Sequence, residues 1–333
     1  MSILKCNISV IIPVYNGEAF LGKSFRSVSL QGVPGTEIVM IDDGSSDRSW
    51  LLMSEFIGDE LRILRHGNRG LAATLNRGIS LAKGMYIARL DQDDVALPGR
   101  LAKQVAFLAA NSDLAMCGTW SHIYQGDTPT DRYHRHPISN EALQLELLFD
   151  NPFVHSSMMI RMDVLREVGC YSEDKLRQPP EDYELWSRIA RHYRIANIPD
   201  VLTIYREVPG SMSRTGESPF LGNVMRISAE NIFHIVSSNH SMEDCTALAE
   251  LYHIGGRVGY RSALTKVKAL EMLDLAAESI AGERKTWSPE FQESYVRMRT
   301  HLSSRFLRRL FPKQLLIPAR WLRDRLHGRR RRT

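Results

Sequence analysis

Three carboxylates crowd the end of a short apolar segment, MYIARLDQDD, at residues 85–94. Alternate side chains of an extended chain point to the same face, so Asp91 and Asp93 can converge while Gln92 turns away. Asp94 follows directly. Such hard oxygen ligands suit Mg²⁺ or Mn²⁺, and Mg²⁺ is often held by one or two carboxylates together with substrate phosphates. A solvated acidic turn is the common alternative, so this interpretation depends on what else the chain carries.

A second acidic pair, Glu181-Asp182, occurs in the segment PPEDYELWSRIA at residues 179–190. A helical pattern begins there after two prolines, so both carboxylates lie in a first helical turn, where the helix dipole favours them. Taken alone, the pair is better explained as a structural cap of the helix. Its chemical interpretation also depends on the rest of the chain.

Alternating strand and helix patterns must position these side chains. Apolar, β-like runs occupy residues 8–14, 37–41, 61–65 and 85–90, and helical patterns lie between them, the last from about Leu71 to Lys83. This alternation predicts an α/β fold, a Rossmann-like, mainly parallel sheet flanked by helices, with ligands beyond the carboxyl ends of its strands. The polar clusters 15–17, 42–45 and 91–94 should therefore share one edge of the sheet.

Four segments, in this order, resemble the nucleotide-sugar-dependent glycosyltransferases of family 2, which have the GT-A fold. They are VIIPVYNGEAFLGKSFRSV, IVMIDDGSSDRS, NRGLAATLNRGISLAKGMYIARLDQDD and PPEDYELWSRIA. Any one of them is a weak signal, but the ordered set is a strong one.

This resemblance implies a nucleoside diphosphate-sugar as the donor. Pro13, Val14 and Tyr15 would line the pocket for the base, with Glu18 close by. Asp42 would accept a hydrogen bond from a ring nitrogen of the base. Because a carboxylate accepts but does not donate, uracil or another base with an N–H group suits it, and a UDP-sugar is favoured.

The resemblance also implies how the reacting groups are held. Asp91 would face the ribose, and Asp93 would bind the Mg²⁺ or Mn²⁺ that bridges the two phosphates. Asp182 would be the general base that activates an acceptor hydroxyl, so that the sugar configuration inverts. His155, in NPFVHSSMMIR, would contact the leaving phosphate or the acceptor, although a structural histidine is an equal alternative.

Two positions depart from the family pattern. Val208 stands where many relatives carry a histidine that can help hold the metal or the diphosphate. Leu75 precedes Asn76 where some members have an arginine, which removes a phosphate contact.

Composition and charge set the wider limits. The 333 residues are 43% hydrophobic and 24% charged, as in soluble globular proteins. No apolar run is long enough to span a membrane, and the start MSILKCNISV lacks a secretory signal, so we expect a cytoplasmic protein. The four cysteines form no C-x-x-C pair, which indicates neither a zinc site nor a disulfide framework.

The sequence predicts three parts: a GT-A domain at residues 1–218, a helical extension at 219–302 and a basic amphipathic tail at 303–333. The tail contains eleven Lys or Arg residues and one acid, in a chain whose net charge is +5. Apolar residues interleave with its arginines, so it could lie on the anionic cytoplasmic face of a membrane. A solvated tail or a packing helix is an equal alternative, and nucleic-acid binding is disfavoured because the body is acidic.

The sequence thus predicts an inverting hexosyltransferase that acts on a saccharide or lipid-linked acceptor, in cell-surface polysaccharide or glycolipid assembly. The helical extension could embrace the acceptor, form an oligomer interface or cover the sheet. Two other functions stay open. The string from Asp91 to Val95 also fits the D-x-D-x-[TV] motif of haloacid dehalogenase-type phosphohydrolases, and a non-catalytic sugar-nucleotide-binding protein would keep the same pocket.

Overall fold

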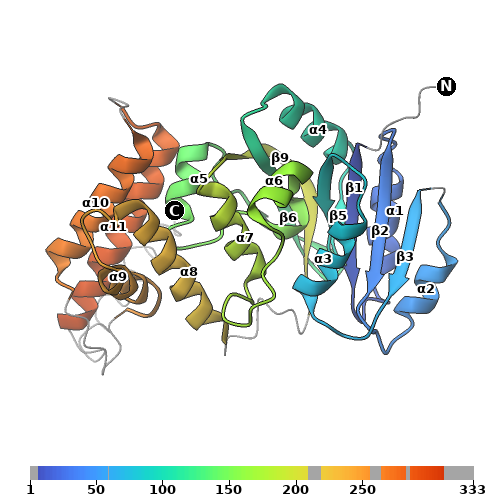
Figure 1. Ribbon diagram of the computed structural model, residues 1–333, viewed down its shortest axis with the longest axis horizontal. Helices are drawn as coiled ribbons and strands as arrows, with labels where there is room; N and C mark the ends of the chain where they lie inside the picture. Colours follow the sequence, from blue (N-terminus) through green and yellow to red (C-terminus); the bar gives the residue numbers. More distant parts are fainter. Residues whose placement is uncertain (1–6, 59, 209–218, 256–263, 283–285, 311–333) are drawn as a thin grey trace, which may run out of the picture. The chain divides into compact units, whose positions relative to one another are not determined.

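The chain consists of two units, residues 1–227 and 228–333. The structure is a computed structural model that describes residues 7–58, 60–208, 219–255, 264–282 and 286–310. In the described residues the first unit contains a sheet with its flanking helices, and the second unit is helical (Figure 1).

Nine strands form one sheet within the described residues, in the order β3-β2-β1-β4-β8-β6-β9-β5, with β7 paired to β6. They are β1 (Ile8–Val14), β2 (Thr36–Asp42), β3 (Leu61–Arg65), β4 (Tyr86–Arg89), β5 (Val95–Ala96), β6 (Leu114–Gln125), β7 (Thr128–His134), β8 (Met159–Arg161) and β9 (Arg194–Glu207). The strands β1 to β4 pair in parallel, as do β6 and β9. The strands β5, β7 and β8 pair antiparallel with their neighbours. The predicted mainly parallel α/β fold is therefore confirmed.

The helices follow the strands along the chain. The first unit contains α1 (Leu21–Ser29), α2 (Ser49–Glu55), α3 (Leu71–Leu81), α4 (Arg100–Ala110), α5 (Asn140–Glu146), the 3₁₀ turn η1 (His155–Ser157), α6 (Met162–Val168) and α7 (Glu181–Ala190). The others are α8 (Pro219–Val236), which runs across the division of the units, α9 (Met242–Ile254), α10 (Lys266–Ala281) and α11 (Pro289–Leu310).

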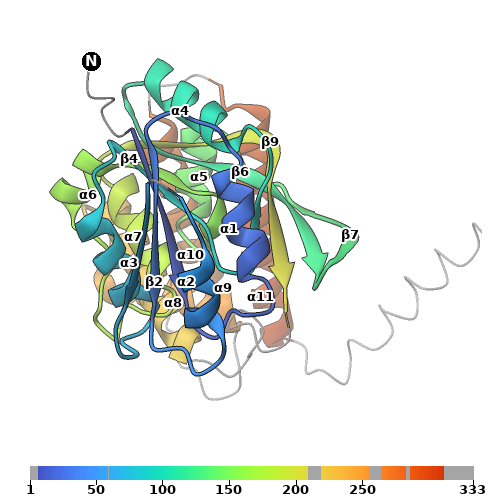
Figure 2. The ribbon, with the colours of Figure 1, turned by 90° about the vertical axis from the view of Figure 1, so that its right-hand side faces the viewer.

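The sheet separates two hydrophobic cores because successive side chains of a strand point to opposite faces. On β1, Ile11 packs with α3, α6 and α7, whereas Val10 and Ile12 pack with α1, α2 and α4. Figure 2 shows α3 and α6 on one side of β2, and α1 and α2 on the other. Burial on both faces explains why β1 reads as a continuous apolar run rather than as an alternating one.

Element ends differ slightly from the predicted ones. The strand expected at residues 85–90 is β4, Tyr86–Arg89. The helix expected to reach Lys83 ends at Leu81, because Ala82 has an extended backbone with ψ of 138°. Helix α11 reaches Leu310, beyond the predicted boundary at residue 302. Residues 311–333 lie outside the described part, so the three-part division stays a prediction.

Among the described helices, none is both long and apolar enough to cross a membrane.

Candidate active site

The loop after β1 lies against the loop after β4, as expected for the carboxyl edge of a parallel sheet. The backbone N–H of Tyr15 donates to Gln92 Oε1 at 2.7 Å, and Gln92 Nε2 donates back to the Tyr15 carbonyl at 2.8 Å. Gln92 thus turns away from its neighbouring aspartates and fixes the Tyr15 backbone. A Cβ on Gly17 would lie 2.3 Å from Gln92 Oε1, so the glycine is needed for this close approach.

The residues expected around the base differ in exposure. Pro13 and Val14 are buried at the end of β1, whereas Tyr15 is 48% exposed and can be reached by a ligand. Glu18 is exposed and its Oε2 accepts a hydrogen bond from the Arg48 N–H at 2.8 Å. This contact ties the loop after β1 to the start of α2.

Asp42 ends β2 and is fully buried. Its Oδ2 lies 2.9 Å from Arg65 Nε, and its Oδ1 accepts from the Ser45 N–H at 3.3 Å. A base could reach this carboxylate only if the covering residues moved, so the predicted contact stays a prediction. The neighbouring Asp43 accepts hydrogen bonds from the backbone N–H groups of Arg69 and Gly70, at 2.7 and 2.9 Å.

The three aspartates after β4 form one acidic group. Carboxylate oxygens of Asp91, Asp93 and Asp94 all lie within 4.8 Å of one another. Burial, and then the charge of Asp91, raises the pKa of Asp93 to about 6. The same two causes hold the pKa of Asp94 well above its usual range. Asp94 Oδ2 is buried without a hydrogen-bond partner, so this donor set suits a cation.

Arg206, on β9, contacts this group through both its backbone and its side chain. Its backbone N–H donates to Asp94 Oδ1 at 2.7 Å, and its guanidinium donates to the Asp93 carbonyl and, at 2.7 Å, to the Gly126 carbonyl. The guanidinium also lies 4.4 Å from the centroid of the Phe20 ring. A positive charge is thus held near the aspartates, two residues before Val208.

The second acidic pair lies in the first turn of α7, as predicted. Asp182 Oδ2 accepts a hydrogen bond from Asn151 Nδ2 at 2.7 Å, and Oδ1 accepts from the Tyr183 N–H at 2.8 Å. Burial, and then the charge of Asp182, raises the pKa of Glu181 to about 7. Burial likewise raises the pKa of Asp182. Glu181 can therefore exchange protons close to neutral pH, and Asp182 holds its proton to a higher pH than an exposed aspartate would.

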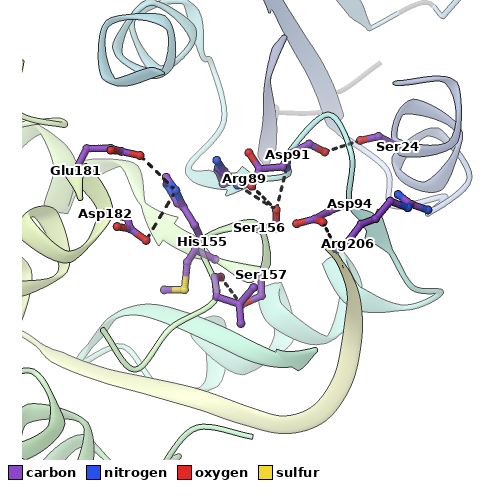
Figure 3. A network of polar contacts seen from close by, with 12 residues as sticks. Ser24, Arg89, Asp91, Asp94, His155, Ser156, Ser157, Glu181, Asp182 and Arg206 are labelled. Atoms are coloured by element: carbon purple, nitrogen blue, oxygen red, sulfur yellow. Dashed lines mark hydrogen bonds and ion pairs between the residues drawn. The ribbon is translucent and has the colours of Figure 1, made fainter. Parts of the chain in front are cut away.

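His155 lies beside this pair (Figure 3). Its Nδ1 is 4.0 Å from both Glu181 Oε1 and Asp182 Oδ2, and its Nε2 is 2.8 Å from the Tyr171 hydroxyl. Burial, and then the charge of Arg89, holds the pKa of His155 well below its usual range, so the imidazole is neutral. In a solvated turn this histidine would titrate at about 6.5.

The turn η1 joins the two acidic groups. Ser156 follows His155 directly, and its Oγ donates to Asp91 Oδ2 at 2.9 Å while accepting from Arg89 Nη1 at 3.0 Å. The structure therefore brings Asp91 and His155 into one network, with Asp182 on the other side of the imidazole (Figure 3).

Sequence reasoning missed several members of this network. Arg89 could have been noticed as a charge within an otherwise apolar strand. Ser156 directly follows His155 in the segment NPFVHSSMMIR, but nothing in the sequence indicates its contact with Asp91. Asn151 and Tyr171 follow no pattern that marks them, because their contacts with Asp182 and His155 arise only when distant segments of the chain come together.

Solved structures share the fold of this chain. Residues 1–349 of S. aureus TarS in complex with UDP-GlcNAc match it with a TM-score of 0.60 at 16% identity, over 90% of this chain and 92% of that one. The mannosyltransferase PcManGT from Pyrobaculum calidifontis, in complex with GDP-Man and Mn²⁺, matches with a TM-score of 0.52 at 16% identity, over 92% and 88%. The fold is of the GT-A type.

Sequence relatives identify the family. The profile described as glycosyl transferase family 2 matches residues 9–169. The amylovoran biosynthesis glycosyltransferase AmsE of Erwinia amylovora is 30% identical over 200 residues, 58% of this chain and 74% of that protein. An uncharacterized glycosyltransferase of Haemophilus influenzae is 28% identical over 261 residues, 74% of this chain and 80% of that protein. The chain belongs to glycosyl transferase family 2. It is a transferase enzyme, which sets aside the phosphohydrolase and the non-catalytic alternatives.

Proposed function

We propose that this glycosyltransferase moves a sugar, with inversion, from a nucleoside diphosphate-sugar to a hydroxyl of a saccharide or lipid-linked acceptor. The observation that carries the proposal is the pair of acidic groups, Asp91 to Asp94 and Glu181-Asp182, that η1 holds at one edge of the sheet. One group suits a donor diphosphate with its cation, and the other suits a proton acceptor.

At the donor end, Asp93 would hold Mg²⁺ or Mn²⁺, assisted by Asp91 or Asp94. Oxygen ligands of this number and hardness fit either ion, and the unpartnered Oδ2 of Asp94 leaves a lone pair for it. When bound, such an ion stabilises the negative charge that develops on the departing diphosphate. Tyr15 would contact the base with its ring. Asp42 would accept a hydrogen bond from an N–H group of the base, which favours a UDP-sugar.

At the acceptor end, Asp182 would take the proton of the acceptor hydroxyl. The freed oxygen forms a bond to the anomeric carbon from the face opposite the diphosphate, while the bond from that carbon to the phosphate oxygen breaks and its electron pair leaves with the nucleotide. Asn151 supports this role because its hydrogen bond fixes the Asp182 carboxylate. General-base assistance of this kind is worth about 10²–10⁴ in rate.

The biological setting is proposed from the relatives. By its name, AmsE is an amylovoran biosynthesis glycosyltransferase, which supports a role in cell-surface polysaccharide or glycolipid assembly. We propose that the reaction takes place in the cytoplasm, with the arginine-rich tail 303–333 as a candidate for peripheral contact with an anionic membrane surface.

A donor screen tests the proposal. UDP-, GDP- and dTDP-sugars would each be incubated with the full-length protein and Mn²⁺ or Mg²⁺, with and without an acceptor mixture. We expect release of UDP from one UDP-sugar, dependent on the divalent ion and lost in excess chelator. Full turnover in chelator would contradict the metal assignment, and failure of every donor in the presence of its ion would contradict the proposed function.

A further inference from the structure

Arg89 is a charged residue buried within the sheet. Its residue exposure is 2%, and its guanidinium donates to the Asp91 carboxylate and to Ser156 Oγ. Its backbone is held as well, because the N–H donates to the Met158 carbonyl at 3.0 Å and the carbonyl accepts from Arg100 Nη2 at 2.7 Å. A buried charge is costly unless it is paired, so its position at the end of β4 requires the acidic partners beside it.

The charge of Arg89 reaches both acidic groups. It pairs with Asp91 on one side, and it opposes the burial that raises the pKa of Glu181 and of Asp182 on the other. Figure 3 shows its guanidinium between Asp91 and His155.

The other titratable groups around Asp182 cannot supply this positive charge. His155, in η1, is neutral because its pKa lies well below the usual range. Burial raises the pKa of Tyr171, so its hydroxyl stays protonated. Glu181, on the same helix, and Asp91 are acidic, and the Asn151 amide donates a hydrogen bond without a charge.

We propose that Arg89 is a positioning residue with two effects: it orients Asp91 for the donor, and its positive charge favours the ionised form of Asp182 that a base requires. The second effect rests on the proposed function of Asp182. The first does not, because Asp91 can be tested by nucleotide binding alone.

Two measurements on the full-length protein separate these effects. Calorimetry with UDP and Mn²⁺ reports the donor end. The pH dependence of kcat at saturating donor and Mn²⁺ reports groups of the enzyme–substrate complex, including the base. For Arg89→Met we expect the dissociation constant of UDP to rise about tenfold or more. We also expect the acid limb of the kcat–pH profile, where kcat falls as the pH drops, to shift to higher pH by about one unit.

Two further variants divide the contributions. Ser156→Ala removes the hydrogen bond to Asp91 but keeps the charge, so UDP binding should weaken severalfold while the acid limb stays in place. Arg89→Lys should behave in the same way, because an ammonium keeps the charge without the geometry of the guanidinium fork. These two variants also test the proposal if Arg89→Met does not fold.

Arg161→Met is the matched control. Arg161 is also partly buried, but its guanidinium donates to the carbonyls of Leu108, Asn111 and Leu114 rather than to carboxylates. We expect a lower melting temperature with UDP affinity and acid limb unchanged. The proposal is wrong if folded Arg89→Met keeps both wild-type values, if Arg161→Met reproduces its two shifts, or if Arg89→Lys and Ser156→Ala leave UDP binding intact. If no donor is turned over, the proposed function fails, and the UDP titration still decides the effect on Asp91.

Discussion

The acidic side chains of the site combine burial with like charge, and this combination determines when each one is ionised. Asp93 has a pKa of about 6 and Glu181 a pKa of about 7, each raised first by burial and then by a neighbouring carboxylate. A bound cation would favour the charged form of Asp93, whereas Glu181 and Asp182 titrate as a coupled pair. The two ends of the site should therefore respond differently to metal and to pH.

The first residue-scale prediction concerns Asp93. Asp93→Asn removes the charge of the proposed metal ligand at nearly constant volume, so we expect transfer to fall about 100-fold or more with little change in melting temperature. Asp131→Asn, at an exposed position on β7, is the control and should keep wild-type activity. The rate of sugar transfer and a thermal melt check both variants, and an Asp93→Asn enzyme of normal rate would refute the assignment.

Asp182→Asn tests the base against a structural cap. We expect transfer to fall about 10²–10⁴-fold while the affinity for UDP and Mn²⁺ stays within about twofold. Asp163→Asn, in the first turn of α6, changes an acidic residue at a helix start without touching the site. If Asp182 is only a cap, the two variants will lose similar stability and both will stay active.

The pH dependence has a definite sign. A base must be unprotonated, and burial raises the pKa of Asp182, so kcat should begin to fall at a higher pH than it would with an exposed aspartate, whose pKa is about 3.9. A kcat–pH profile at saturating donor measures this acid limb. A profile that stays flat down to about pH 4 would exclude Asp182 as the titrating group.

The arrangement of the strands and helices explains why only part of the site could be predicted from the sequence. The order of parallel strands brings the loops after β1, β2 and β4 together, and the alternation of strand and helix patterns in the sequence predicts it. The three aspartates do meet, but not through the expected extended geometry, because β4 ends at Arg89 and Gln92 and Asp93 lie in a turn that the Asp94 N–H closes on the Asp91 carbonyl. The contact of Ser156 with Asp91 depends instead on β8, which pairs antiparallel with β4 and β6 across long intervals of sequence, and the contacts of Asn151 and Tyr171 join segments that are 31 and 16 residues apart. No local pattern encodes that pairing.

Helix α7 presents the second acidic pair from a buried position, which gives an element-scale prediction. Leu185 is fully buried in the core shared with α3 and α6, so Leu185→Ala should lower the free energy of unfolding by about 2–5 kcal/mol. Leu30, which follows α1 and is 82% exposed, is the control position, and Leu30→Ala should change the free energy of unfolding by less than about 0.5 kcal/mol. Urea unfolding compares the two, and equal effects would mean that α7 is not packed as described.

At the scale of the whole molecule, the acidic residues of the candidate active site and the most basic segment lie in different parts of the chain. The acidic groups belong to the unit of residues 1–227, whereas the arginine-rich residues 303–333 belong to the other. Because α11 extends to Leu310, a truncation that tests the tail should begin after that residue and leave the helix whole.

We expect the full-length protein to sediment with anionic vesicles and the protein lacking residues 311–333 to stay in the supernatant, with the difference shrinking as salt is raised. Neutral phosphatidylcholine vesicles are the control surface. Equal sedimentation of both proteins with anionic vesicles would remove the membrane hypothesis.

The position of His155 next to Ser156 has a consequence for the spacing of the two acidic groups. Ser156 Oγ binds Asp91, and the Nδ1 atom of the preceding residue, His155, lies 4.0 Å from Asp182 Oδ2, so one peptide unit, about 3.8 Å between Cα atoms, connects the neighbours of both groups. A residue inserted between His155 and Ser156 would separate these two contacts even if both side chains were kept. We therefore expect an insertion at this point to impair transfer more than a conservative substitution of either residue does.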